Sequence, residues 1–321
     1  MHSSIQWDIR DVARPASLRQ ADANRVAIGH AFVDNRTFDQ VCTSIIEHAK
    51  ERGRSAHVIT PNAQHIVLLH KDPRLRRIYE RADLVVPDGM SLLLAARFHG
   101  CSFRERVTGV DIFRELCILA AANGLKVFFL GGLPGSAELA AKTIKQQAGE
   151  LIYETYCPPV GFEKSTAELK AIEDGIIAAS PDILFVALGA PKQEYWIHDH
   201  GLKLSVPVSI GVGGSFEIVG GIVPRAPMFM QRVGCEWLYR LCREPRRMWR
   251  RYLIGNCQFL WIVLLQRIRR ALLVRVLRLA AEDGFAAELD EMAARQPMAY
   301  ASLVATVTNR EMQDVSDPAA A

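Results

Sequence analysis

The chain lacks several features that mark common protein classes. Its longest apolar stretch, from Phe259 to Leu265, is too short to span a bilayer, which needs about 20 residues, and the N-terminus has no apolar core of signal-peptide length. None of its seven cysteines forms a CxxC pair or has zinc spacing, so we expect reduced, mostly buried thiols, with Cys42 and Cys117 inside apolar helical patterns. These absences argue against secretion, a membrane span and a scaffold held by disulfides or zinc.

Composition and patterning predict a folded α/β protein. Half of the 321 residues are hydrophobic, which suffices for a full core, and the net charge of +4 is modest. Short apolar runs alternate with segments of helical period, which predicts a parallel sheet with helices on both faces over residues 25–227. Arginines then interleave with Trp and Tyr, so we expect residues 228–281 to form a basic helical appendage. Residues 1–24 are expected to be a flexible tail, and 282–321 disordered or weakly helical.

The main functional signal is a set of polar or glycine-rich loops, each of which follows an apolar run. The carboxyl ends of parallel strands meet at one edge of a sheet, where open α/β folds keep their chemistry, so these loops predict one large polar site. They are Thr60-Pro61-Asn62, Pro87-Asp88-Gly89, Gly131 to Ser136, Gly189 to Glu194 and Gly213 to Phe216.

Together with Arg106 to Asp111 and Arg225-Ala226-Pro227, these loops resemble a bacterial glycosyltransferase family, glycosyltransferase family 26, over roughly Val26 to Tyr252. The family includes teichoic-acid N-acetylmannosamine transferases, enterobacterial common antigen N-acetylmannosaminuronate transferases and xanthan-type glucuronosyl-lipid transferases. The resemblance implies a Rossmann-like core of the GT-E type with a helical C-terminal appendage. The chain departs from the family pattern at Glu217, where an aspartate is usual, and at Pro224, where a lysine is usual.

The resemblance also implies an activity. It implies an inverting transferase, active without metal or cofactor, that moves N-acetylmannosamine, its uronate, glucuronate or glucose from a UDP donor. The acceptor would be a polyprenyl-diphosphate-linked saccharide, in exopolysaccharide or cell-surface glycan synthesis. In the residues themselves, no DxD motif follows a strand and no His, Asp and Glu cluster has metal spacing.

Asp88 is the candidate catalytic base, because inverting transfer needs a group that takes the proton of the acceptor hydroxyl. Its alternative role is turn formation, for which Pro-Asp-Gly is suited. The resemblance places the catalytic aspartate on this motif and implies that Thr60 and Gln193 lie in the same pocket. Thr60 and Asn62 offer a hydroxyl and an amide to a sugar or the acceptor, although both are also ordinary residues at a helix start.

The remaining loops supply candidate substrate-binding residues. Gly131, Gly132 and Gly135 could cradle a diphosphate at a helix N-terminus, or could serve only a tight turn. Arg106, Thr108 and Asp111 fit either phosphate contact or helix capping. The rest of the predicted binding set is Asn62, Gly89, Lys192, Glu194, Gly213, Gly214, Ser215 and Phe216.

The appendage predicts a lipid-facing role. Arginine with Trp and Tyr at helical spacing suits an anionic membrane surface, whereas nucleic acid is the alternative that we do not favour. The resemblance implies a peripheral protein on the cytoplasmic face of the plasma membrane, with Arg240, Arg247 and Arg250 reaching the lipid diphosphate. Their spacing of seven and three residues places them on one helical face. The resemblance also allows association of copies through the core.

Two other classes stay open from the residues alone. The glycine loop at Gly131 lacks the GxGxxG spacing, but Glu150 or Glu154 lies about 20 residues on, as in an NAD(P)-dependent Rossmann oxidoreductase. A non-enzymatic, membrane-associated scaffold would also use the basic appendage.

Overall fold

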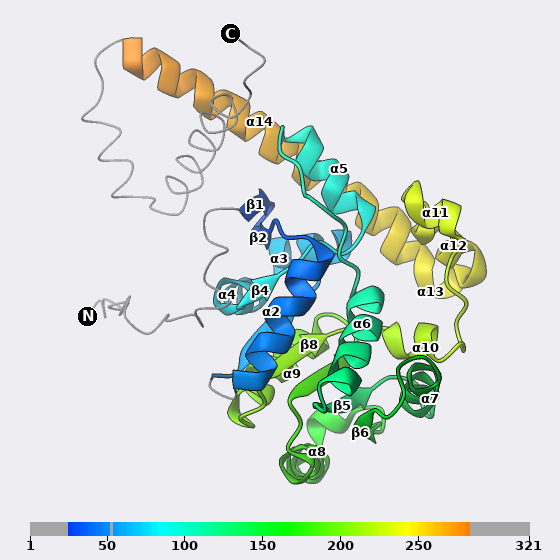
Figure 1. Ribbon diagram of the computed structural model, residues 1–321. Coiled ribbons are helices and arrows are strands. Elements are labelled where there is room, and N and C mark those ends of the chain that lie inside the picture. Colours follow the sequence, from blue (N-terminus) through cyan, green and yellow to red (C-terminus); the bar gives the residue numbers. More distant parts are fainter. Residues whose placement is uncertain (1–24, 52–53, 283–321) are drawn as a thin grey trace. The chain divides into compact units, whose positions relative to one another are not determined.

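The computed structural model describes residues 25–51 and 54–282 (Figure 1). Contacts divide the chain into two compact units, of which the first ends at Phe259 and the second begins at Leu260. The predicted core thus shares its unit with the first part of the predicted appendage. The tail predicted at 1–24, and all of the tail predicted at 282–321 except Glu282, lie outside the described residues.

The first unit is built on a parallel sheet, as the alternating pattern predicts. Its strands lie in the order β4-β3-β8-β7-β5-β6, and each neighbouring pair is parallel. Their bounds are β3 Ala56–Ile59, β4 Leu84–Val85, β5 Lys126–Gly131, β6 Ile152–Tyr156, β7 Ile183–Ala187 and β8 Val208–Gly211. A separate antiparallel hairpin, β1 (Arg25–Ile28) with β2 (Ala31–Asp34), is not predicted by the pattern.

Helices cover both faces of the sheet because alternate strand residues point to opposite sides. In β5, Val127 and Phe129 belong to one buried cluster, which also contains residues of α2, α6, α7 and α10. Phe128 and Leu130 belong to another cluster, with residues of α8 and α9. These helices are α2 Phe38–Glu51, α6 Gly109–Ala122, α7 Ser136–Ala148, α8 Thr166–Ala179, α9 Lys192–Asp199 and α10 Ser215–Val219.

The other helices join the strands or follow the sheet. Asp72 caps α4 by accepting from two backbone N–H groups, with Pro73 at the first helical position, as the sequence predicts. The bounds are α3 Ala63–Lys71, α4 Pro73–Arg81, α5 Met90–Phe98, α11 Met228–Arg232, α12 Glu236–Arg243, α13 Pro245–Trp249 and α14 Gly255–Glu282, with single turns η2 Phe162–Lys164, η3 Gly201–Lys203 and η4 Arg250–Ile254.

All seven cysteines are free. Cys42 and Cys117 are buried as predicted, but the prediction of mostly buried thiols is wrong, because the other five lie in loops or on helix surfaces and keep some exposure. Among the described residues, none of the helices combines the length and the hydropathy that crossing a membrane requires.

Candidate functional site

The predicted loops do converge on the carboxyl edge of the sheet. The loop after β4 is joined to the loop after β3 by a hydrogen bond from Asp88 N to Pro61 O of 2.8 Å. The segment before α6 is joined to it in turn, since Val107 N donates to Pro87 O at 3.0 Å. Gly89 occupies φ 101° and ψ 147° at the N-cap of α5, a conformation that favours glycine. Backbone bonds therefore hold Asp88 against the ends of two neighbouring segments.

Asp88 has the electrostatics of a proton acceptor near neutral pH. Burial raises the pKa of Asp88 from 3.8 to about 6, and the carboxylate of Glu236 contributes in the same direction. The residue as a whole keeps some exposure to solvent. The positive charges of Arg240 and Arg106 oppose this increase in the pKa. A carboxylate with a pKa close to the operating pH is both ionised and basic enough to take a proton.

Glu236 and Arg240 come from α12, in the predicted appendage. Arg240 Nη2 donates to Glu236 Oε1 at 3.2 Å, and Arg106 Nη1 lies 3.8 Å from Glu236 Oε2. Arg106 also donates to the backbone oxygen of Gln231 at 3.3 Å. The charges of Arg106 and Arg240 thus act on both Glu236 and Asp88. Glu236 is absent from the residues predicted by sequence, because nothing local distinguishes it from a surface glutamate.

Thr60 and Gln193 meet at the end of β8. Thr60 Oγ1 donates to Gly211 O at 3.2 Å, and a Cβ on Gly211 would lie only 2.5 Å from Gln193 Nε2. The absence of a side chain at Gly211 therefore makes room for the Gln193 amide beside Thr60. Asn62 caps α3, where its side-chain oxygen accepts from Gln64 N, so its predicted sugar contact would fall to the amide NH2 group.

Glu194 is buried, with 1% of its surface exposed. Its Oε1 accepts from Gln193 Nε2 at 2.8 Å and faces His65 Nε2 at 3.4 Å. Burial alone would raise the pKa of Glu194, but the hydrogen bonds from His65 and Gln193 lower it overall. His65 is absent from the residues predicted by sequence; its place at the third position of α3 was the available signal.

The segment before α6 is an ordered polar corner. Thr108 caps α6, and its hydroxyl donates to Asp111 Oδ2 at 2.5 Å. Arg225 binds both oxygens of Asp111, at 2.6 and 2.8 Å. Burial would raise the pKa of Asp111, but the hydrogen bonds of Arg225 and Thr108 lower it. Asp111 and Thr108 are thus engaged within the protein, which favours their capping role over the predicted phosphate contact.

The glycine loop after β5 also makes internal hydrogen bonds. Gly132 N donates to Ala187 O at 2.9 Å, and Leu133 N donates to Glu217 Oε1 at 2.8 Å. A carboxylate therefore occupies the loop that was predicted to cradle a diphosphate, and it uses one of the N–H groups that a phosphate would need. Gly135 precedes α7 in the left-handed region, at φ 78°. The diphosphate role of this loop stays a prediction.

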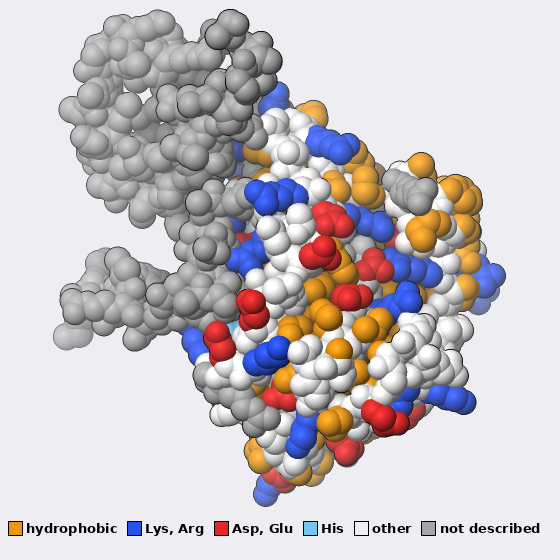
Figure 2. Space-filling model, in the orientation of Figure 1, with side chains coloured by type: hydrophobic (Ala, Val, Ile, Leu, Met, Phe, Trp, Pro, Cys, Tyr) orange, Lys and Arg blue, Asp and Glu red, His pale blue; other side chains and the backbone are white. Residues whose placement is uncertain are grey.

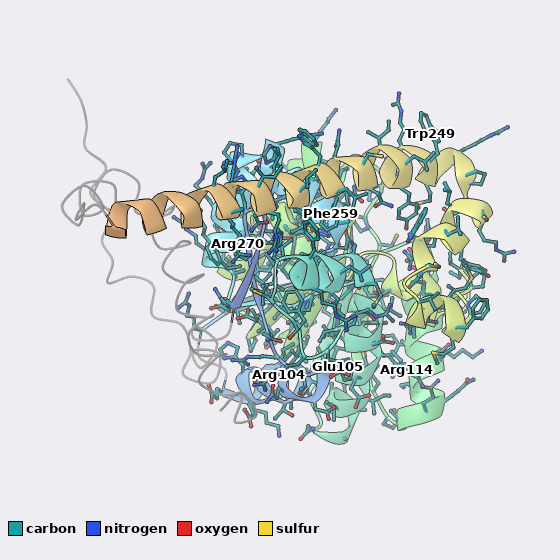
Figure 3. The ribbon with its side chains drawn as sticks, turned by 90° about the horizontal axis from the view of Figure 1, so that it is seen from above. Arg104, Glu105, Arg114, Trp249, Phe259 and Arg270 are labelled. Carbon is teal, nitrogen blue, oxygen red and sulfur yellow. The ribbon has the colours of Figure 1, made fainter. Side chains whose placement is uncertain are left out.

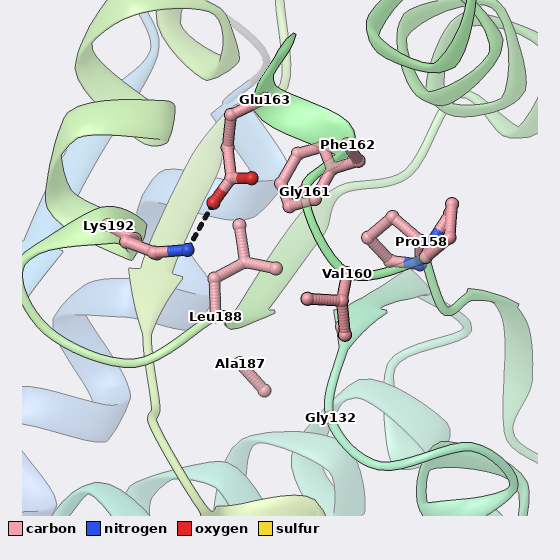
Figure 4. Close-up of a pocket in the computed structure, with 11 residues that line it drawn as sticks. Gly132, Pro158, Val160, Gly161, Phe162, Glu163, Ala187, Leu188 and Lys192 are labelled. Carbon is pink, nitrogen blue, oxygen red and sulfur yellow. Dashed lines mark hydrogen bonds and ion pairs between the residues drawn. The ribbon is translucent and has the colours of Figure 1, made fainter. Parts of the chain in front are cut away.

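A pocket of about 170 Å³ lies between the ends of β5 and β7 and the loop that follows β6 (Figure 4). Figure 4 shows Lys192 reaching across to Glu163, with Nζ and Oε1 2.5 Å apart, above Leu188 and opposite Val160. The backbone of Gly131 and Gly132 forms another part of the wall. The loop from Pro158 to Glu163 is missing from the sequence-predicted site; its two prolines and its glycine were the available signal.

The loop after β8 is split between the site and the core. Gly213 N donates to Gln193 Oε1 at 3.1 Å, and Gly214 lies next to Glu217, whose Oε2 would be 3.6 Å from a Cβ at that position. Ser215 Oγ donates to Val212 O, and Phe216 is wholly buried against Phe113 at 5.0 Å between ring centroids. The positions of Ser215 and Phe216 do not support the predicted nucleotide contact, which stays a prediction.

The helix assumed to carry Arg240, Arg247 and Arg250 is not continuous, so the expectation of a shared face is wrong. Helix α12 ends at Arg243 and α13 begins at Pro245, because proline has no N–H with which to continue the preceding helix. Arg250 lies in η4, 5.4 Å from the centroid of the Trp249 ring. The side chain of Arg247 lies outside the described part of the structure.

The described surface of α11 to η4 combines apolar and cationic side chains. Figure 2 shows hydrophobic side chains gathered over α11 and α12, and Figure 3 shows Trp249 on the outer side of its helix. The exposed hydrophobic residues here are Met228, Phe229, Val233, Trp237, Leu238, Trp249, Leu253 and Ile254. Exposed arginines accompany them at positions 243, 246 and 250.

No group of three or more His, Cys, Asp or Glu side chains suited to a metal ion occurs in residues 25–51 and 54–282. The predicted independence from metal remains a prediction.

Comparison with known proteins identifies the class of enzyme. The chain matches the Glycosyl transferase WecG/TagA/CpsF family over residues 26–272. It is 32% identical, over 67% of this chain and 83% of the relative, to the N-acetylglucosaminyldiphosphoundecaprenol N-acetyl-beta-D-mannosaminyltransferase of Bacillus spizizenii strain W23. It is 29% identical to the protein of the same name from Bacillus subtilis strain 168, over 64% of this chain and 78% of that protein. The oxidoreductase and scaffold alternatives are set aside, and the chain belongs to the WecG/TagA/CpsF family of glycosyltransferases.

Proposed function

We propose that this enzyme transfers a sugar, with inversion, from a UDP donor to a saccharide carried on undecaprenyl diphosphate. Two relatives named as N-acetylmannosaminyltransferases with such an acceptor support the acceptor class, and they make N-acetylmannosamine the first donor to test. The observation that carries the proposal is Asp88, a carboxylate with a pKa of about 6 at the carboxyl edge of the sheet.

In the proposed reaction, Asp88 takes the proton of the acceptor hydroxyl while the oxygen of that hydroxyl attacks the anomeric carbon of the donor. The bond from that carbon to the UDP oxygen breaks, and UDP leaves with the electron pair. Attack from the side opposite the leaving group inverts the configuration. Arg106 and Arg240, whose charges already act on Asp88, are the nearby cations available to stabilise the negative charge on the leaving diphosphate.

We place part of the donor nucleotide in the pocket beside Gly131, Gly132 and Lys192. The pocket has a volume of about 170 Å³, whereas typical ligand sites have about 300 Å³ or more. It would therefore enclose only a portion of the donor. Lys192 is exposed and its Nζ pairs with Glu163, and an exposed ion pair contributes about 0–1 kcal/mol to stability. Exchange of Glu163 for a ligand oxygen would therefore cost little.

We further propose that the exposed surface of α11 to η4 docks on an anionic membrane, where the acceptor lipid resides. Arginine meets lipid phosphate and Trp suits the headgroup level, and each basic residue near such a surface contributes about 1 kcal/mol. The enzyme would then be a peripheral protein at the inner membrane face.

The test is release of UDP from a panel of UDP-sugars by the full-length enzyme. The assay contains undecaprenyl-diphosphate N-acetylglucosamine in vesicles with or without anionic lipid. We expect turnover with one donor, dependence on the acceptor, and stimulation by anionic lipid that falls as salt rises. An enzyme that turns over no UDP-sugar with this acceptor, but does so with another nucleotide sugar or another lipid, would overturn the substrate assignment.

A further inference from the structure

The buried carboxylate of Glu194 occupies a place that a substrate-contacting residue would not. Its side chain is 1% exposed, and its Oε1 is already engaged by Gln193 Nε2 at 2.8 Å. Burying a charge destabilises the folded state unless the charge is paired and hydrogen-bonded, so a buried carboxylate at this edge of the sheet indicates a role other than stability. The neighbouring Gln193 supplies one.

The Gln193 amide is held from two sides. Its Oε1 accepts from Gly213 N at 3.1 Å, and its Nε2 donates to Glu194. These two bonds distinguish the oxygen end of the amide from the nitrogen end and so select one of its two orientations. Gly211 leaves the space that the amide fills. Without the acceptor at Glu194, only the bond to Gly213 would fix the amide.

His65 extends the arrangement to the loop after β3. Its Nδ1 accepts from Asn62 N at 3.3 Å, which leaves Nε2 to donate to Glu194 Oε1 at 3.4 Å. Asn62 directly follows the Thr60-Pro61 step, so the same carboxylate oxygen receives donors from the first turns of α3 and α9, the helices that follow the loops after β3 and β7. His65 and Glu194 are 129 positions apart in the chain.

We propose that Glu194 is a positioning residue: His65 holds its carboxylate in place, and the carboxylate orients the Gln193 amide beside the loop that carries Thr60. It does not contact the substrate. This inference rests on the proposed function only in assigning Gln193 to the transferase site; the geometry that it describes is independent of that assignment.

The test is a double-mutant cycle with Glu194→Met, Gln193→Ala and the double variant in the full-length enzyme. Methionine keeps the length of the side chain but removes the acceptor of Gln193 Nε2, so loss of orientation is expected to lower kcat by about 10- to 100-fold in Glu194→Met, with a smaller change in the KM for the UDP-sugar. The double variant should be no slower than Gln193→Ala, because Glu194 acts through Gln193. Effects that multiply would overturn the proposal, since Glu194 would then act separately.

A second readout does not depend on activity. Gly213 N donates to Gln193 Oε1, so amide hydrogen exchange at Gly213 should accelerate in both single variants. Unchanged exchange in Glu194→Met overturns the inference, whereas a fully active Gln193→Ala with accelerated exchange overturns the catalytic assignment of Gln193 instead.

Two further variants keep the test interpretable. Glu173→Gln removes the carboxylate of another histidine pair, with His200 Nδ1 2.7 Å from Glu173 Oε1, and should leave kcat unchanged because this pair lies outside the site. If Glu194→Met does not fold, Glu194→Asp retains the charge but shortens the side chain by one methylene. Its loss of kcat should be smaller and should also disappear in the Gln193→Ala background, and effects that multiply would refute the proposal equally.

Discussion

Asp88→Asn is expected to stabilise the fold and abolish transfer at the same time. The pKa of Asp88 is raised from 3.8 to about 6, first by burial and then by the charge of Glu236. A carboxyl group whose pKa is higher in the folded state than in the unfolded state makes folding less favourable wherever it is ionised. The neutral asparagine removes that cost and also removes the proposed base.

The magnitude follows from the two pKa values. At about 1.4 kcal/mol per pKa unit, the increase from 3.8 to about 6 corresponds to a cost of about 3 kcal/mol. The cost is absent below pH 3.8, where both states are protonated, grows between 3.8 and about 6, and is fully present above 6. Because Asp88 keeps partial exposure, solvent screening reduces the expected gain to about 1–3 kcal/mol at pH 8. At pH 5 the gain should be about half as large.

The assay compares urea unfolding of the parent and Asp88→Asn at pH 8 and pH 5, alongside UDP release by folded protein. We expect a higher urea midpoint for the variant at pH 8, a smaller difference at pH 5, and a loss of about 100- to 10,000-fold in kcat. In the parent enzyme, kcat/KM should fall as the pH decreases below about 6.

The matched control is Asp111→Asn. Its carboxylate has a lowered pKa because the hydrogen bonds of Arg225 and Thr108 outweigh burial. It therefore contributes stability that is present above the unfolded pKa and lost at lower pH, so this substitution should destabilise the protein at pH 8. If Asp88→Asn also lowers stability at pH 8, or retains activity, the reasoning about Asp88 is refuted.

Three further predictions follow from the site. Glu236→Gln should shift the acid limb of kcat/KM to lower pH and Arg240→Gln to higher pH, and shifts in the same direction would contradict the charge assignment. Gly211→Ala places a Cβ 2.5 Å from the amide of Gln193, so kcat should fall as in Gln193→Ala while UDP still raises the melting temperature; unchanged kcat would refute this packing. Gly132→Ala, at φ +80° with a Cβ 2.5 Å from a buried hydroxyl, should destabilise the protein by about 1–3 kcal/mol in urea unfolding, and no change would mean that the loop relaxes.

The sequence predicts the sheet and its functional edge because the relevant signals are local. An apolar run followed by a polar or glycine-rich turn is visible within about ten residues, as at Thr60, Asp88 and Gln193. Caps such as Asp72 before Pro73 are equally local, since the side chain bonds to the next turn of its own helix. These signals determine which side chains reach the edge of the sheet, but not their neighbours there.

Tertiary structure decides which of those side chains meet. The position of β8 between β3 and β7 places the carbonyl of Gly211 against Thr60, across 151 residues of chain. Tertiary packing also brings the charge of Glu236 close enough to act on Asp88, and it brings His65 to Glu194. The break before Pro245 separates arginines that their spacing had placed on one face. Sequence alone thus determined the fold class and the chemistry available at the strand ends, through local patterning. Only the packed structure decided the hydrogen bonds and the pKa of Asp88, because both depend on groups that are distant in the chain and adjacent in space.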